Sequence, residues 1–339
     1  YFYGFLAGYI DFYTHTRGGD GLPDLYENGV AVSDSGYMTD LITSRAVRFI
    51  EKNAAQPFFL EIAYNAAHWP FQRPGHPTRA ANNSRFQGPD DSLPATRADY
   101  IAMLEHADGG VGTIMATLKQ RGLDKNTLVI FTNDNGAPFR GAANAAKKAP
   151  AKENFPGRQL AGYNGQLRSG KGTTFEGGVR VPFIVRWPGV VKPDTRTDAL
   201  AANIDVVPTI VEACAAAKPK HEIDGQSFLP LLKGEKTTAR EIFSYYYGDR
   251  LEAVRKGKWK LHLPHAYRSY VDMVPAARDG LPATTHQRQI GLSLYDLEAD
   301  QGEKNDVSAA HPEVVKELQE LAASERKKLD AGKRPVGRL

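Results

Sequence analysis

Three short polar stretches carry side chains that could bind a metal ion, hold positive charge or transfer a proton. Asp134 and Asn135 stand side by side before Gly136, separated by two residues from the apolar run 127–131, while His68 precedes Trp69 and Lys171 stands between two glycines. Carboxylate and amide oxygens are typical ligands of a hard cation. An imidazole can exchange a proton near neutral pH, and an ammonium group is a compact positive charge. These residue types suit chemistry on an anionic substrate.

Each stretch also has an ordinary interpretation. Asp, Asn and Gly are common turn formers, a loop histidine such as His68 is usually a surface residue, and a glycine-rich segment alone is weak evidence. The segment around Lys171 also lacks the Gly-Lys-Ser/Thr ending of a nucleotide-binding P-loop. The position of each stretch along the chain therefore decides between the two interpretations.

The elements that must position these residues favour a binding site. Apolar runs predict strands at 58–64 and 127–131, and helical spacing predicts a helix at 96–121 between them. A strand, a helix and a strand in this order indicate a βαβ unit and a parallel sheet. His68 and Asp134 would then lie at the carboxyl ends of two strands, where open α/β sheets bind ligands.

The pattern changes near residue 240, which predicts two regions. The first, 1–240, is an α/β domain, and further apolar patterns in it predict a helix at 40–53, a strand at 181–188 and a helix at 204–217. The second, 241–339, is predicted as a small antiparallel sheet packed with a terminal helix, from strand-like runs at 241–247, 251–255, 259–263 and 292–297 and an amphipathic run at 312–329.

Composition excludes several classes of protein. The 339 residues are 41% hydrophobic and 24% charged, and the formal net charge of +4 is too small to indicate nucleic-acid binding. No apolar run approaches the ~18–20 residues of a membrane helix. Cys214 is the single cysteine, which rules out an intrachain disulfide and a cysteine-rich metal site. We interpret Cys214 as a small buried hydrophobe.

Together these motifs resemble the sulfatases of the alkaline-phosphatase-like superfamily, in the arylsulfatase branch. The resemblance covers essentially the whole chain and rests on Tyr3-Gly4-Phe5, Ala67-His68-Trp69-Pro70, Asp134-Asn135-Gly136, the segment from Gly170-Lys171-Gly172 through Phe175-Glu176-Gly177-Gly178 to Arg180-Val181-Pro182, Asp205-Val206-Val207-Pro208-Thr209, Asp224-Gly225, Arg255-Lys256-Gly257-Lys258-Trp259-Lys260 and Leu294-Tyr295-Asp296-Leu297. It implies an alkaline-phosphatase-like α/β sandwich with a mostly parallel central sheet flanked by helices, plus the small C-terminal antiparallel sheet.

The resemblance also implies a role for each residue. Asp134 and Asn135 would be two ligands of one active-site calcium ion, Lys171 would contact the sulfate and its bridging oxygen, and His68 would bind the sulfate and protonate the leaving alcohol. A sulfate monoester resists hydrolysis because its negative charge repels nucleophiles. A divalent ion and an ammonium group offset that charge, and a proton donor neutralises the leaving alkoxide.

Part of the family's machinery does not occur in this sequence. The family's nucleophile is a formylglycine made by a formylglycine-generating or anaerobic maturation enzyme from a Cys/Ser-x-Pro-x-Arg motif, which this chain lacks. The family's paired aspartates and Lys-x-His segment are not found either. The resemblance thus implies an N-terminally truncated fragment, inactive alone and aggregation-prone where one side of its sheet is unpaired. With one cysteine, we expect a periplasmic or secreted enzyme.

Two alternatives stay open at this point. One is a phosphonate or phosphate monoester hydrolase of the same superfamily, and the other is a non-catalytic protein that binds sulfated glycans. The substrate is expected to be a sulfated small molecule or glycan, because basic segments could line the pocket: the loop 137–168, the segment near His15 and Arg17, and the tail around His262, His265 and Arg268. Asn82-Asn83-Ser84 matches a glycosylation sequon.

Overall fold

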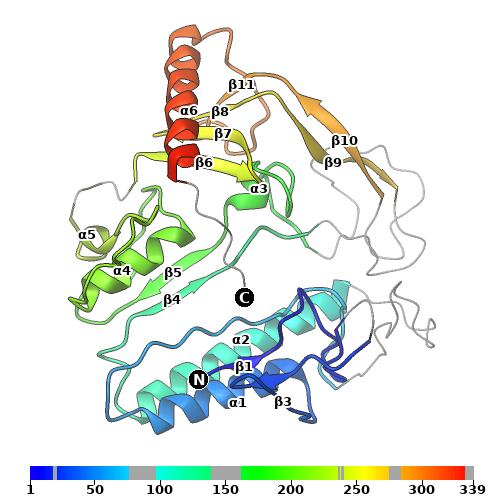
Figure 1. Cartoon of the computed structure of the whole chain (residues 1–339), viewed down its shortest axis with the longest axis vertical. Coiled ribbons are helices and arrows are strands. Elements are labelled where there is room, and N and C mark those ends of the chain that lie inside the picture. Colours follow the sequence, from blue (N-terminus) through cyan, green and yellow to red (C-terminus); the bar gives the residue numbers. More distant parts are fainter. Residues whose placement is uncertain are drawn as a thin grey trace.

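The computed structural model describes residues 1–17, 21–75, 97–138, 162–235, 237, 240–274 and 284–332. Figure 1 shows three parts: an N-terminal helical part, a middle part around one pair of strands, and a C-terminal sheet with the last helix beside it. The sequon at 82–84 and most of the basic loop, 139–161, lie outside the described residues.

Two long helices form the base of the N-terminal part. α1 (Met38–Lys52) packs along α2 (Arg97–Gln120), close to the two helices that apolar spacing predicts. Beside them, β1 (Tyr3–Gly4), β2 (Tyr26–Glu27) and β3 (Val30–Ala31) form a small antiparallel sheet. The two helices bury a shared apolar seam made of Ala46, Ile50, Ile114 and Leu118.

The predicted βαβ unit is not seen in the described residues. β4 (Val129–Thr132) pairs antiparallel with β5 (Phe183–Arg186), and the predicted strand at 58–64 is extended chain without a strand assignment. Phe58, Leu60 and Ile62 pack on the α1–α2 seam, so one face of this segment is covered by helices. An extended segment that packs on helices has the same alternation of apolar residues as a strand in a sheet. The alternation therefore does not indicate whether the segment forms hydrogen bonds with a neighbouring strand.

Short helices lie within and after the glycine-rich segment. They are α3 (Glu176–Val179), η1 (Asn203–Asp205), α4 (Val206–Ala213) and α5 (Leu229–Leu232). The interpretation of Cys214 as a buried residue was wrong, because α4 ends at Ala213 and Cys214 follows it as an exposed cap. A residue beyond the last helical turn is not held on the packed face of the helix.

The C-terminal part confirms the predicted small antiparallel sheet. Its strands are β6 (Ile242–Tyr247), β7 (Arg250–Lys256), β8 (Trp259–His262) and β11 (Ser293–Asp296), in the order β11-β8-β7-β6. The terminal helix α6 (Pro312–Gly332) covers one face of this sheet, with Leu318 and Ala322 packed among Leu251, Val254, Leu261 and Leu294.

A hairpin extends from this sheet. β9 (His265–Val274) pairs antiparallel with β10 (Thr284–Ile290), and Figure 1 shows the two strands projecting away from α6. No strand pattern at these residues was predicted from the sequence. The hairpin and the sheet together enclose the aromatic ring of Phe175, which belongs to the glycine-rich segment.

Candidate active site

Backbone hydrogen bonds join the loop of Asp134 and Asn135 to the glycine-rich loop that carries Lys171. The amide of Gly136 donates to the carbonyl of Gly178 at 3.0 Å, and the amide of Lys171 donates to the carbonyl of Ala137 at 3.3 Å. Asn164 bridges the same two loops, since its side chain receives the Ala137 amide at 2.8 Å and donates to Ser169 at 3.0 Å. The fold therefore brings two of the three sequence-predicted stretches together.

This junction requires residues without a side chain. A Cβ on Gly136 would lie 1.8 Å from the carbonyl oxygen of Gly177, and a Cβ on Gly178 would lie 2.2 Å from that of Thr173. Both distances are far shorter than a van der Waals contact, so any larger residue would push the loops apart. The glycines of the sequence motif are needed for this close approach.

Asp134 and Asn135 carry oxygen atoms of the kind that bind calcium, but these two side chains are too few to complete a calcium site. Asp134 is exposed and Asn135 is half-buried, and the Asn135 amide donates to the Asp134 carboxylate. A carboxylate and an amide carbonyl fit calcium in kind, while calcium takes about 6–8 oxygen ligands. Within the described residues, no three His, Cys, Asp or Glu side chains cluster closely enough to hold a metal ion. Other groups would have to complete the coordination.

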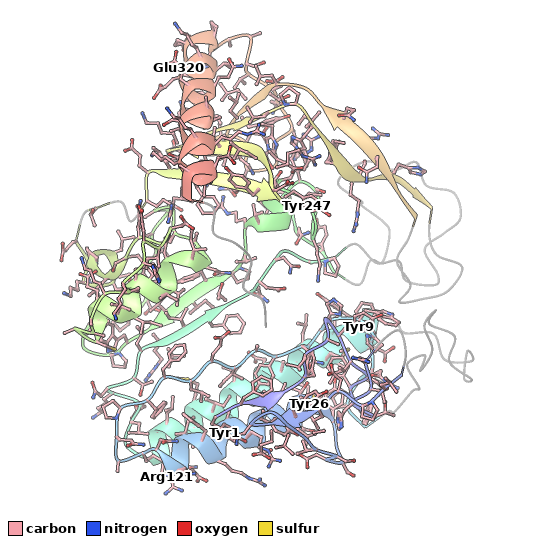
Figure 2. All side chains as sticks on the ribbon, viewed as in Figure 1. Tyr1, Tyr9, Tyr26, Arg121, Tyr247 and Glu320 are labelled. Carbon is pink, nitrogen blue, oxygen red and sulfur yellow. The ribbon has the colours of Figure 1, made fainter. Side chains whose placement is uncertain are left out.

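His68 lies in an aromatic cluster of the N-terminal part. Its ring stacks on Tyr9 with 5.8 Å between centroids, and its Nδ1 is 2.7 Å from the carbonyl oxygen of Trp69. Because a carbonyl can only accept, Nδ1 carries the hydrogen and Nε2 is the nitrogen that can exchange a proton. In Figure 2, Tyr9 is at the edge of the N-terminal part nearer the C-terminal sheet.

Of the C-terminal residues that were expected to line the pocket, two are buried and one is exposed. His262 and His265 are buried, only 0% and 4% exposed, so the expectation that they line an open pocket was wrong. Their ring nitrogens face the carboxylates of Glu303 and Glu252 instead. Arg268 is exposed, with Nη1 3.7 Å from the point where a Cβ on Gly172 would lie.

His15 does not line an open pocket either. It is 4% exposed, its Nε2 lies 3.1 Å from the carbonyl oxygen of Gly36, and burial lowers its pKa. A neutral, enclosed imidazole is a poor contact for an anionic substrate.

The glycine-rich loop is anchored to the C-terminal sheet by groups that sequence reasoning missed. The ring of Phe175 stacks on His262 with 4.7 Å between centroids, and the Arg168 guanidinium lies over the Phe175 ring, 4.1 Å from its centre. The Lys260 ammonium of β8 contacts the Glu176 carboxylate of the same loop at 2.9 Å. The sequence signal that could have revealed this anchor was Lys260, a charged residue between the apolar residues Trp259 and Leu261 of a predicted strand.

Comparison with known proteins gives the family. The profile described as "Sulfatase" matches residues 1–215, which is more than half of the chain. Two further profiles match, "N-sulphoglucosamine sulphohydrolase, C-terminal" at 170–263 and "C-terminal region of aryl-sulfatase" at 238–339. The chain therefore belongs to the sulfatase family, and its fold is the α/β fold of that family.

Individual relatives agree with this assignment. The chain is 35% identical over 294 residues to N-acetylgalactosamine-6-O-sulfatase of Bacteroides thetaiotaomicron, covering 85% of this chain and 50% of that protein. The crystal structure of Ps i-CgsB in complex with k-i-k-neocarrahexaose is similar with a TM-score of 0.63 and 25% identity, covering 89% of this chain and 57% of that one. The chain spans about half the length of the curated relatives it matches.

One similar structure belongs to an enzyme that acts on a different ester. The phosphonate monoester hydrolase SpPMH of Silicibacter pomeroyi has a TM-score of 0.53 and 17% identity, covering 97% of this chain and 67% of that one. At this identity the likeness shows the fold alone.

In the described part of the chain, no helix combines the length and apolar character that crossing a membrane requires.

Proposed function

We propose that this chain forms part of the active site of a sulfatase that hydrolyses an aryl or carbohydrate sulfate monoester to an alcohol and inorganic sulfate. The observation that carries the proposal is the junction of two loops, where Gly136 donates to Gly178 and Lys171 donates to Ala137. It joins the loop of Asp134 and Asn135 to the loop of Lys171, which supports a role for both loops in binding one anionic group. In this proposal residues 1–240 are the catalytic part and 241–339 a C-terminal subdomain.

The proposed roles follow from the chemistry of the side chains. Asp134 and Asn135 would contribute two ligands to a calcium ion, which when bound supplies positive charge opposite the sulfate oxygens. Lys171 would contact the sulfate and its bridging oxygen, and His68 would protonate the leaving alcohol through Nε2. The formylglycine nucleophile is expected outside these 339 residues, made by a maturation enzyme, because no Cys/Ser-x-Pro-x-Arg motif occurs among them.

A sulfated glycan is the substrate class that the neighbours of this chain support. The relative from Bacteroides thetaiotaomicron is named for N-acetylgalactosamine 6-O-sulfate, and Ps i-CgsB was solved with an oligosaccharide. The exposed guanidinium of Arg268 beside Gly172 would provide a contact for an anionic sugar. Such a substrate is consistent with a periplasmic or secreted enzyme.

The decisive experiment is a turnover assay of the intact protein together with whatever segments flank these residues. We expect hydrolysis of 4-nitrophenyl sulfate to exceed that of the matching aryl phosphonate in kcat/KM. Lys171→Ala should lower kcat by about 10²–10³-fold, the usual effect of removing one transition-state charge contact. Lys192→Ala, at an exposed lysine outside the site, serves as the control and should leave kcat unchanged.

Other results would point to the alternatives. Preference for the phosphonate would make the protein a phosphonate monoester hydrolase. Tight binding of a sulfated oligosaccharide without turnover, in protein shown by mass spectrometry to carry formylglycine, would make it a non-catalytic binding protein. A calcium titration by calorimetry, repeated with Asp134→Ala, tests the metal ligands independently of activity.

A further inference from the structure

A cluster of buried ionisable groups lies between the glycine-rich loop and the C-terminal sheet. Lys260 on β8 is 0% exposed, and so is Glu303, while Glu176 is 2% exposed. The Lys260 Nζ donates to the carbonyl of Thr174 at 2.8 Å and to Glu176 Oε1 at 2.9 Å, and it lies 3.0 Å from Glu303 Oε1. The ammonium group therefore has three oxygen atoms within 3.0 Å, two of them in the loop.

Glu303 holds the loop from a second side. Its Oε2 receives the backbone amide of Glu176 at 2.6 Å, and its Oε1 receives His262 Nε2 at 2.8 Å. Its own carbonyl accepts from Arg168 at the start of the loop, at 3.0 Å. Glu303 has a φ of 49°, in the left-handed region that non-glycine residues rarely adopt. Such a conformation is energetically costly and persists only where the surrounding structure imposes it, often close to a functional site.

The stability of the fold does not by itself explain why these charges are buried. Each buried ion loses several kcal/mol of hydration, and an apolar set of the same volume is often equally stable. The Glu176 and Glu303 carboxylates raise the pKa of Lys260 above its ordinary value although burial alone would lower it, so the ammonium stays charged. Charge-assisted hydrogen bonds add geometric specificity as well as energy, so they restrict the direction in which their partners can lie.

The cluster is connected to the candidate site through the loop itself. The Thr173 hydroxyl donates to the carbonyl of Gly170 at 2.9 Å, and the Gly177 amide donates to the carbonyl of Arg168 at 2.8 Å. These two hydrogen bonds link the residues before Lys171 to the residues after it. At the far end of the loop, the Gly178 carbonyl receives the amide of Gly136. Fixing Thr174 and Glu176 therefore fixes both the loop of Lys171 and the loop of Asp134.

We propose that Lys260 and Glu303 are positioning residues of the sulfatase reaction, which hold the glycine-rich loop so that Lys171 and the Asp134–Asn135 pair face the same sulfate group. Neither touches substrate, and both act through Thr174 and Glu176. The expected effect on kcat rests on the proposed function. The expected effect on the structure of the loop rests only on the contacts described above.

The test compares Lys260→Met with Lys258→Met in the intact protein. Lys258 has a partly exposed ion pair with Asp296, immediately before the same strand, and so controls for loss of a lysine charge. We expect Lys260→Met to lower kcat at least 10-fold with KM within about 3-fold of wild type, and to speed amide hydrogen exchange at 168–178 at least 10-fold. Lys258→Met should change none of these values.

A double variant separates positioning from stability. Lys260→Met with Glu303→Gln removes one of the two buried carboxylates that lose the ammonium, so its melting temperature should return part of the way toward that of wild type while kcat stays low and exchange at 168–178 stays fast. If kcat and exchange both recover with the melting temperature, the cluster is only structural and the proposal is overturned. Wild-type exchange and wild-type kcat in Lys260→Met would overturn it as well.

The exchange measurement also keeps the two proposals distinguishable. If the wild-type protein hydrolyses no sulfate ester but Lys260→Met still loosens residues 168–178, the proposed reaction fails and the positioning of the loop stands. If the wild type is active and the loop is unaffected, the positioning role fails while the sulfatase function stands.

Discussion

At the scale of single residues, His262 and Glu303 form a buried pair with shifted protonation. Burial lowers the pKa of His262 to about 4, despite the opposing influence of the Glu303 carboxylate. Burial alone would raise the pKa of Glu303, but the Lys260 ammonium and the His262 hydrogen bond hold it at about 2. The imidazole is thus neutral, and the carboxylate charged, over most of the working pH range.

This pair makes stability depend on pH. In the unfolded chain His262 takes up a proton below about pH 6.5, whereas in the folded protein it does so only near pH 4. The unfolded state therefore binds more protons in this window, and the free energy of unfolding should fall by about 3 kcal/mol between pH 6.5 and 4. Below about pH 4.5 the unfolded form of Glu303 takes up a proton too, which steepens the loss.

Urea unfolding of the chain at pH 7.0, 6.0, 5.0 and 4.5 measures this slope. His262→Gln cannot titrate, yet its amide can still donate to Glu303, so we expect its curve to be flatter than wild type between pH 6.5 and 4.5. His15 and His265 also have lowered pKa values and will leave a residual slope. Equal slopes in the two proteins would contradict the assignment to His262.

At the scale of elements, the close approach of two loops is the feature that joins the site. No hydrophobic pattern identifies it, because the contact is between backbone atoms of Gly136, Gly177 and Gly178. The glycines were visible in the sequence, but their partners were not.

Substituting Gly136 tests this junction. In Gly136→Ala the new methyl group would meet a backbone carbonyl, which cannot rotate away, so we expect a loss of about 1–3 kcal/mol of unfolding free energy. Calcium affinity of the intact protein should fall with it, because Asp134 and Asn135 directly precede the displaced residue. Gly8→Ala, at an exposed glycine with nothing within 4 Å, is the matched control. Identical urea midpoints in the two variants would refute the close contact.

Sequence patterns predicted the elements well wherever a single face decides the structure. The helices at 40–53 and 96–121 and the C-terminal sheet with its terminal helix correspond to α1, α2 and the sheet of β6, β7, β8 and β11 with α6, whereas the hairpin β9–β10 was not predicted. The pairing of strands was predicted less well, since β4 turned out to run antiparallel to β5. Apolar alternation identifies which side of a strand is covered, and the identity and direction of its neighbour depend on distant parts of the chain.

At the scale of the whole molecule, the pair β4–β5 exposes apolar surface. Phe131 and Ile184 lie directly opposite each other in this ladder and are 42% and 60% exposed. Adjacent exposed apolar side chains on a short strand pair are typical of a surface that another segment or molecule covers.

We expect the 339-residue chain expressed alone to bind a hydrophobic dye and to associate as its concentration rises, because this surface meets water. Light scattering after size exclusion and ANS fluorescence measure the two effects. Ile184→Thr combined with Phe131→Thr should reduce both at least twofold. Val30→Thr, on the small N-terminal sheet and 67% exposed, is the control and should have a smaller effect. A monodisperse, dye-free wild type would contradict the prediction.

The sequence alone determined which residues could do chemistry and which family they belong to, because Asp134, Asn135, Lys171 and the glycines around them are defined by type and order along the chain. It also determined the amphipathic helices and strands, because the spacing of their apolar residues can be recognised within a short stretch of sequence. Only the tertiary structure decided that His262 and His265 face buried carboxylates rather than solvent, and that Lys260 and Glu303 hold the glycine-rich loop. Those contacts join residues far apart in the chain, where burial and pairing depend on three-dimensional packing and leave no periodic signal.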